Sequence, residues 1–212
     1  MLYQFTNKPT AQALYNAFQA EPFYLAIAQA RANKKETEKE ALLKYFDFSI
    51  QEAKKYGICY TKENQAIGAS LWHKPQTDEG WEAQSKAKKA FLKNHFGAES
   101  LAVYKKIARG MEEMEETVIE DHYWYLSILA VAKKYQGQGF GRQLLAPVLA
   151  EADRLQTPTF LETFTAVNLI FYGKLGYEVA LEYVEPTLNK TCWVLIRQPT
   201  SVSKNYLIDY SK

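Results

Sequence analysis

Three glycines fall within five positions of the segment KKYQGQGFGRQLL, residues 133–145, just before a helix-forming sequence. Gly137, Gly139 and Gly141 lack the Cβ that would block a ligand, and the amides at a helix start are free donors in a region of partial positive charge. The spacing therefore predicts a phosphate site. The dinucleotide pattern G-x-G-x-x-G fails because its last position is Arg142, and no Gly-Lys-Ser/Thr follows for a P-loop. A tight turn that only packs the helix is the alternative.

The composition limits the class of protein. With 212 residues and 47% hydrophobic content, the chain can bury a sizeable core, and we expect a single domain over 1–212. A net charge of +2, with basic and acidic residues interspersed, predicts no nucleic-acid partner. Because Cys59 and Cys192 are the only cysteines, we expect no metal site and a reducing compartment. The start of the chain has no signal-peptide pattern and no apolar run could span a bilayer, so we expect a cytoplasmic protein without a membrane partner.

The pattern of apolar residues predicts helices and strands in alternation, in an α/β or α+β protein without internal repeats. Thr10 is the expected cap of the first helix, and Gly57 the expected end of the third. Helices are predicted at 10–18, from Pro22 through Ile27, at 36–55, over 79–120 with a break near Gly97, from Arg142 to about Leu155, and at 167–175. Strands are predicted at 1–6, 58–63, 66–72, 122–131, 159–164, 177–184 and 190–198, with a tight turn at Asn64 and Gln65.

Two motifs in this order resemble those of the GNAT superfamily of N-acetyltransferases. In LAVAKKYQGQGFGRQLL, Gln136, Gly139 and Gly141 match the superfamily's Gln/Arg-x-x-Gly-x-Gly/Ala core. In NLIFYGKLGYEVA, Asn168 is followed four residues later by Tyr172 and then by Leu-Gly-Tyr. The further segments SLWHKP, HYWYLSILAV and TCWVLIRQP are similar to the branch of the superfamily that contains puromycin N-acetyltransferase. The clear resemblance covers about residues 120–198.

The resemblance implies a mixed sheet with helices on both faces, splayed open between its fourth and fifth strands, with acetyl-CoA as the cofactor. Those strands would be 122–131 and 159–165. Residues 120–198 would form the cofactor-binding half, and 1–118 the acceptor side, with a helical insertion at 79–120 serving as a lid or a homodimer face. The residues implied to hold the cofactor are Leu129, Ala130 and Val131 by their backbone, then Gln136, Gly137, Gln138, Gly139, Phe140, Gly141 and Arg142 around the diphosphate, and Asn168.

The implied reaction, attack of an amine on a thioester, needs a base, stabilisation of the developing oxyanion and an acid for the departing thiolate. The resemblance places Tyr172 in the role of this acid. Asn168 lies on the same helical face and either bonds the cofactor or caps the helix. We expect the Val131 amide to stabilise the oxyanion.

Two residues are candidates for the general base. Strand alternation puts Glu162 on one face with Phe160 and Phe164, and these apolar neighbours should raise its pKa toward the value that a base needs. His122 is the second candidate, because histidine titrates near neutral pH. A water chain that relays the proton to either group is a further alternative.

The acceptor is expected to be a small-molecule amine. Phe23, Tyr24 and Trp72 are candidates for lining its pocket, although aromatic residues of this kind are more often core. Met111, Met114 and Val118 recur at helical spacing, so the acidic run MEEMEE, residues 111–116, is interpreted as part of a buried stripe with solvated glutamates opposite. Attraction of a cationic amine by this run is the alternative. By kinship the acceptor could resemble an aminonucleoside. The alternatives are a protein or peptide N-terminal acetyltransferase and a non-catalytic regulator that binds acyl-CoA.

Overall fold

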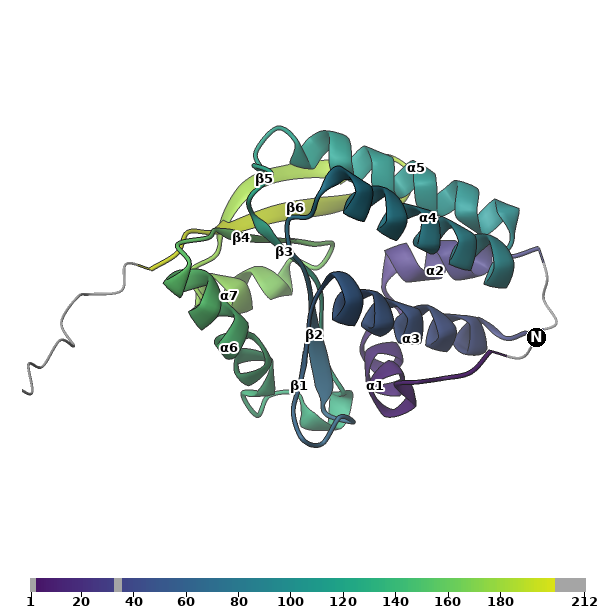
Figure 1. Cartoon of the computed structure of the whole chain (residues 1–212), viewed down its shortest axis with the longest axis horizontal. Helices are drawn as coiled ribbons and strands as arrows, with labels where there is room; N and C mark the ends of the chain where they lie inside the picture. Colours follow the sequence, from purple (N-terminus) through teal and green to yellow (C-terminus); the bar gives the residue numbers. More distant parts are fainter. Residues whose placement is uncertain (1–2, 33–35, 201–212) are drawn as a thin grey trace, which may run out of the picture.

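The computed structural model describes residues 3–32 and 36–200. In these ranges the chain forms seven α-helices, one short 3₁₀-helix and six strands (Figure 1). The helices are α1 (Lys8–Phe18), α2 (Pro22–Gln29), α3 (Glu38–Tyr56), α4 (Asp78–His95), α5 (Ala98–Glu115), α6 (Phe140–Arg154) and α7 (Val167–Gly173), with the 3₁₀-helix at Lys133–Tyr135. The strands are β1 (Gly57–Thr61), β2 (Gly68–His73), β3 (Trp124–Val131), β4 (Thr159–Thr163), β5 (Glu178–Glu185) and β6 (Lys190–Arg197).

The strands form one mixed sheet in the order β1-β2-β3-β4-β6-β5. Only the β3–β4 pair is parallel, and the other neighbours run antiparallel. Helices cover both faces, as predicted: α6 and α7 lie on one side, and the layer α1–α5 lies on the other (Figure 1). Each layer buries its own apolar cluster against the sheet, with Phe46 and Leu71 in the α1–α5 cluster and Leu145 and Leu161 in the α6–α7 cluster.

The β3–β4 pair is short, which confirms the predicted splay. Trp124 pairs with Thr159 and Tyr125 with Phe160, and the ladder then stops although both strands continue. The strands that part are the third and fourth of the described sheet, because residues 3–6 form no strand and residues 1–2 lie outside the described ranges. The six strands predicted after residue 6 all form.

A β-bulge at Ser127 changes the orientation of β3. On the facing strand Leu71 pairs with Ile128 and Trp72 with Leu126, so Ser127 is an extra residue, and its hydroxyl donates to the Leu71 carbonyl over 3.2 Å. Before the bulge, Leu126 packs toward α6, whereas Ile128 after it packs with the α1–α5 cluster. The bulge thus exchanges the faces of the strand in the region where β3 leaves β4.

The start of the chain differs from the prediction for a tertiary reason. Tyr3 donates from its hydroxyl to Asp47 on α3 (2.8 Å), and the Asn7 amide donates to the same carboxylate (2.6 Å). These contacts hold the segment along helix α3 rather than in the sheet. Helix α1 therefore begins at Lys8 after Asn7, and Thr10 is a buried residue inside the first turn rather than the predicted cap.

The other helix ends follow local sequence rules. Thr37 and Glu40 form a capping box at the start of α3, which ends at Gly57 as predicted. Thr77 accepts a hydrogen bond from the Gly80 amide at the start of α4. The break near Gly97 separates α4 from α5, as predicted, because Gly97 has a φ of 99° that favours glycine.

Candidate active site

The parted strands leave a free backbone edge on β3. From Leu126 to Val131 the side of β3 that faces β4 has no strand partner in the described residues. Leu129, Ala130 and Val131 lie on this edge. The Gln136 side chain donates to the Val131 carbonyl over 2.9 Å, which ties the glycine loop to the end of the strand. An extended ligand with amide groups could pair here as an added strand.

The glycine loop lies directly beyond this edge. Gly137 and Gly139 have φ values of 74° and 79°, and a Cβ at either position would meet no atom within 4 Å. Gly139 is the N-cap of α6 and no side chain caps that helix, so the amides of Phe140, Gly141 and Arg142 are free for an anion. Cationic and amide side chains stand exposed around this mouth: Lys133, Lys134, Gln136, Gln138 and Arg142.

Gly141 has a different role from the two preceding glycines. A Cβ at this position would lie 3.1 Å from the Cζ atom of Phe171, which is tighter than ordinary van der Waals contact. The third glycine therefore allows α6 to approach α7. This contact sets the distance between the anion site and the helix that carries Tyr172.

Tyr172 lies on α7 in the apolar cluster beneath α6. Its ring contacts those of Phe171 and Tyr177, with centroids 5.1 and 5.6 Å apart, and its hydroxyl has no hydrogen-bond partner among the described residues. Burial, and then the nearby Tyr177, raise the pKa of Tyr172, so the phenol keeps its proton. Asn168, one turn earlier, donates from its side chain to Thr163 Oγ1 (2.9 Å) and so ties α7 to the end of β4.

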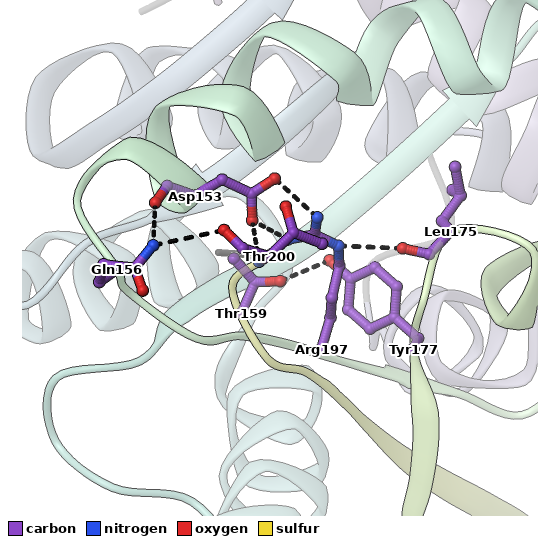
Figure 2. A network of polar contacts seen from close by, with 7 residues as sticks. All are labelled: Asp153, Gln156, Thr159, Leu175, Tyr177, Arg197 and Thr200. Atoms are coloured by element: carbon purple, nitrogen blue, oxygen red, sulfur yellow. Dashed lines mark hydrogen bonds and ion pairs between the residues drawn. The ribbon is translucent and has the colours of Figure 1, made fainter. Parts of the chain in front are cut away.

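A polar network around Arg197 holds the residues that follow α7 (Figure 2). Arg197 donates to both oxygens of Asp153 over 2.8 Å and to the Leu175 carbonyl over 2.9 Å. Thr159 donates to the Tyr177 hydroxyl over 2.9 Å. Because Tyr177 packs against Tyr172, the network holds the predicted acid in place.

Glu162 lies on β4 two residues beyond Phe160, the last residue that pairs with β3. Its Oε2 accepts a hydrogen bond from the Tyr125 hydroxyl over 2.9 Å, and Tyr125 stacks on Phe160 with ring centroids 4.8 Å apart. Burial, and then the charge of Glu115, raise the pKa of Glu162 well above its usual range. The sequence predicted a raised pKa from the apolar neighbours Phe160 and Phe164. It did not predict the contribution of Glu115.

Glu115, the last residue of α5, was missed as a site residue. Its carboxyl lies within hydrogen-bonding reach of the Glu162 carboxyl, and burial raises its pKa as well. A signal was present in the sequence, because Glu115 follows the buried Ile107 at i+8 and Met111 at i+4, on the inward stripe of the helix. The interpretation of all glutamates in MEEMEE as solvated was therefore wrong for Glu115.

Glu21 is a second acidic group that the sequence pattern did not reveal. It caps α2, where its Oε2 accepts a hydrogen bond from the Phe23 amide over 3.3 Å. Burial raises the pKa of Glu21 to about 7, although the bond from Phe23 opposes the shift. An acidic residue directly before Pro22 has the pattern of a helix N-cap, and this pattern gave no sign that the pKa of Glu21 is raised.

The structure does not bring His122 to these groups. It lies in an exposed turn before β3, 3.5 Å from Glu120 and edge-on to Tyr123. None of its contacts in the described part of the chain joins it to Glu162 or Tyr172.

The three predicted acceptor-pocket residues separate onto the two faces of the sheet. Phe23 and Tyr24 pack together on α2 in the α1–α5 layer, the same side as Glu162, and Phe23 keeps partial exposure. Trp72 is fully buried beneath α6 on the opposite face, where its indole donates to Ser70 Oγ over 3.0 Å. Trp72 is therefore a core residue with no surface to offer an acceptor.

Residues 3–32 and 36–200 contain neither a metal-binding cluster nor a membrane-spanning helix. No three His, Cys, Asp or Glu side chains gather in an arrangement that could hold a metal ion. No helix in those ranges combines the length and the apolar character needed to cross a membrane.

Comparison with known proteins gives a local sequence match. The family model for the acetyltransferase (GNAT) domain matches residues 99–179, from α5 to the start of β5. An uncharacterized N-acetyltransferase of Schizosaccharomyces pombe is 30% identical over 87 residues, which is 40% of this chain and 35% of that protein. The chain thus spans about a third of the length of this relative.

Solved structures share the whole fold. A histone acetyltransferase-related protein of Corynebacterium glutamicum superposes with a TM-score of 0.61 at 18% identity, covering 94% of this chain and 95% of that chain. Arylalkylamine N-acetyltransferase 2 of Aedes aegypti has a TM-score of 0.59 at 14% identity, covering 94% and 98%. The polyamine N-acetyltransferase of Drosophila melanogaster, which forms N-acetylagmatine, has a TM-score of 0.58 at 15% identity, covering 91% and 94%.

The splayed sheet and the glycine-led helix give the chain the GNAT fold, and residues 99–179 match the GNAT acetyltransferase domain. Part of the chain is also similar to a relative named as an N-acetyltransferase. The superfamily implies acetyl-CoA, and the residues present fit it, since a backbone edge without a partner leads to two open glycines and an uncapped helix start. None of these comparisons supports the puromycin N-acetyltransferase branch in particular.

Proposed function

We propose that this protein transfers an acetyl group from acetyl-CoA to the primary amine of a small molecule, by direct attack in a ternary complex. The observation that carries the proposal is the position of Glu162. This carboxyl group lies on β4 at the point where β3 and β4 part, opposite the free edge of β3. A base is thereby brought beside the place where a thioester would enter.

Residues of the open edge and the glycine loop would hold the cofactor. The backbone of Leu129 to Val131 would pair with its amide groups, the amides from Gly137 to Arg142 would bind its diphosphate, and Asn168 would steady α7 beside it. Acetyl-CoA supplies the activated acyl group. The whole chain would act as one domain, with the first half on the acceptor side.

Three residues would move or hold protons and charge. Glu162, with its raised pKa, would take the proton of the acceptor's ammonium group. Tyr172 keeps its proton in the resting protein and would hold it for a departing thiolate. The amide of Val131 would stabilise developing negative charge at the end of the free edge.

The acceptor class rests on two supports. Solved structures with this fold include acetyltransferases named for arylalkylamines and for a polyamine, although identity of 14–15% supports the fold alone. The α1–α5 side of the sheet places Phe23 and Tyr24 in the same layer as Glu162. We favour an arylalkylamine or aliphatic amine as the acceptor. An aminonucleoside acceptor is supported only by the motif resemblance.

Thiol release from acetyl-CoA tests the proposal with panels of arylalkylamines, diamines, an aminonucleoside and short peptides. We expect release with one of the small amines, and Glu162→Gln should remove the acidic limb of the pH profile. Glu113→Gln, on the exposed face of α5, is the matched control. Release with peptides only would favour a peptide N-terminal acetyltransferase. Calorimetric binding of acetyl-CoA without release would favour a regulator, and absence of binding at millimolar ligand would overturn the assignment.

A further inference from the structure

Glu115 and Glu162 bring two carboxyl groups together from different layers of the fold. Glu115 is the last residue of helix α5, which packs against β5, and Glu162 belongs to β4. Figure 1 shows the positions of these elements. Tyr125 satisfies Glu162 Oε2 over 2.9 Å. The other oxygen, Oε1, is sealed from solvent and accepts no hydrogen bond from any described donor. The carboxyl group of Glu115 lies beside that of Glu162.

Two ionised carboxylates do not share such a position, because both oxygens are acceptors and both groups are charged. A single proton between them removes one charge and supplies the missing donor to Glu162 Oε1. The arrangement then has a net charge of −1, spread over the pair.

The surroundings offer no protein cation to balance this charge. Neither Glu115 nor Glu162 has a lysine or arginine ion-pair partner in the described ranges. The titratable groups that face the pair are acidic or neutral: Glu112 on α5, Glu116 directly after α5, Tyr125 on β3, Tyr183 on β5, Cys192 on β6 with Glu185 next to it and, through Tyr125, Tyr24 on α2. A cation from outside the chain is the missing partner.

We propose that Glu115 and Glu162 form one proton-sharing pair that binds the ammonium group of the acceptor and then takes its proton. This inference rests on the proposed function. The ammonium R–NH₃⁺ gives one proton to the pair, which becomes two neutral carboxyl groups, and the free amine R–NH₂ remains as the nucleophile. The pair returns the proton to water when the product leaves. Glu115 acts through Glu162 and is a positioning residue.

The pair also selects among acceptors. A single negative charge suits a monocationic amine, whereas an amino acid would bring its own carboxylate toward the acidic cluster. We therefore expect kcat/KM for an arylalkylamine to exceed that for the corresponding α-amino acid by at least about a hundredfold.

Infrared titration of the protein without substrate tests the shared proton independently of activity. The titration uses a Glu21→Gln background, because Glu21 has a pKa of about 7 and would add a band of its own. This background should show the band of a protonated carboxyl group at pH 7. Adding Glu115→Gln should abolish the band, because the shared proton is lost with Glu115 and Glu162 alone carries the negative charge. Adding Glu115→Asp should retain the band, and adding Glu113→Gln, on the exposed face of the same helix, should leave it unchanged. Absence of the band from the Glu21→Gln background between pH 5 and 8 would overturn the pair.

Kinetics then test its role. The acidic limb of kcat/KM reports protonation of the pair to two neutral carboxyl groups. It should move up by about one pH unit in Glu115→Gln, because an amide stabilises ionised Glu162 less well than the carboxyl group that shares its proton. KM for the amine should stay within about threefold, since one charge remains, and the double variant Glu115→Gln/Glu162→Gln should raise it more than about tenfold. A profile of Glu115→Gln identical to that of Glu113→Gln would refute the positioning role. If the band is present but no amine supports thiol release, the proposed function fails while the shared proton stands.

Discussion

Gly141 and Phe171 are in close contact: a Cβ at position 141 would lie 3.1 Å from the Phe171 ring, so the ring would have to shift by a few tenths of an ångström. Gly139, two residues earlier, faces open space with a φ of 79°. Similar glycines in one loop thus serve different purposes, one in packing and one in ligand approach, and substitutions can separate them.

Gly139→Val should abolish acetyl-CoA binding while the protein stays folded. The Cβ would stand where the diphosphate approaches, and the left-handed backbone should cost about 1–2 kcal/mol of stability. Calorimetric titration with acetyl-CoA, alongside urea unfolding, measures both effects. Binding within threefold of wild type would remove the loop from the cofactor site.

Gly141→Ala should weaken binding indirectly, by pushing α7 away from α6. The double variant Gly141→Ala/Phe171→Leu should recover binding, since the smaller side chain makes room for the methyl group. The single variants measured in the same titration complete the cycle. If the double variant does not recover binding, acetyl-CoA binding depends on the backbone of Gly141 and not on its packing against Phe171.

Tyr172→Phe should lower turnover by about ten- to a thousandfold with little change in acetyl-CoA binding, as loss of one acid catalyst would. Tyr177→Phe is the matched control, because Tyr177 bonds Thr159 and packs against Tyr172. We expect the control to lose about 1 kcal/mol of stability and to keep most of its activity. Equal losses of turnover in both variants would assign Tyr172 a packing role.

The Asp153–Arg197 pair should make stability depend on acid pH. Burial opposes ionisation of Asp153, but hydrogen bonds from Arg197 and from the Thr200 amide outweigh it and lower the pKa of Asp153. The carboxylate therefore contributes stability above its unfolded pKa of about 4, and this contribution is lost as the pH falls through the lower folded value. Asp153→Ala should reduce the free energy of unfolding by about 3 kcal/mol at pH 7, and by less near pH 3. Urea unfolding at both pH values is the measurement.

Buried His73 should make the protein less stable as the pH falls, because the fold favours its neutral form. Burial lowers the pKa of His73 to about 4, and its Nδ1 lies 2.9 Å from the Gln84 side-chain nitrogen. The unfolded chain takes up a proton near pH 6.5, so the stability due to neutral His73 is present above that pH and falls toward pH 4. Relative to His73→Gln, wild type should lose about 2 kcal/mol between pH 7 and pH 4.5. Parallel stability curves for the two proteins would contradict the buried neutral state.

Patterns of residues close together in the sequence predicted most of the helices and strands, and also the glycine loop proposed to bind the cofactor. Glycine spacing and helix-forming residues lie close together in the sequence, so the loop of Gly137 and Gly139 and the start of α6 were predictable. The splay between 122–131 and 159–165 followed from the family resemblance and is confirmed by the short ladder at Trp124 and Tyr125.

The parts that failed depend on contacts distant in sequence. The first segment was predicted as a strand, but Asp47, about forty residues away, holds Tyr3 and Asn7 against α3. Trp72 was indistinguishable from a pocket residue until the sheet showed which face it takes. Glu115 could not be predicted as a site residue, because it lies beside Glu162 only in the folded protein, where β4 and the end of α5 come together.

The extra residue at Ser127 makes β3 respond unequally to losses and gains of length. Deleting it would remove the bulge but leave Ile128 and Ala130 facing the α1–α5 layer, because the bulge already takes up one position. Inserting one more residue after it would instead turn Ile128 and Ala130 toward α6 and Leu129 toward the opposite helices. The loss of one residue in this strand should therefore be tolerated better than a gain, since only the gain interchanges the two interiors of the molecule.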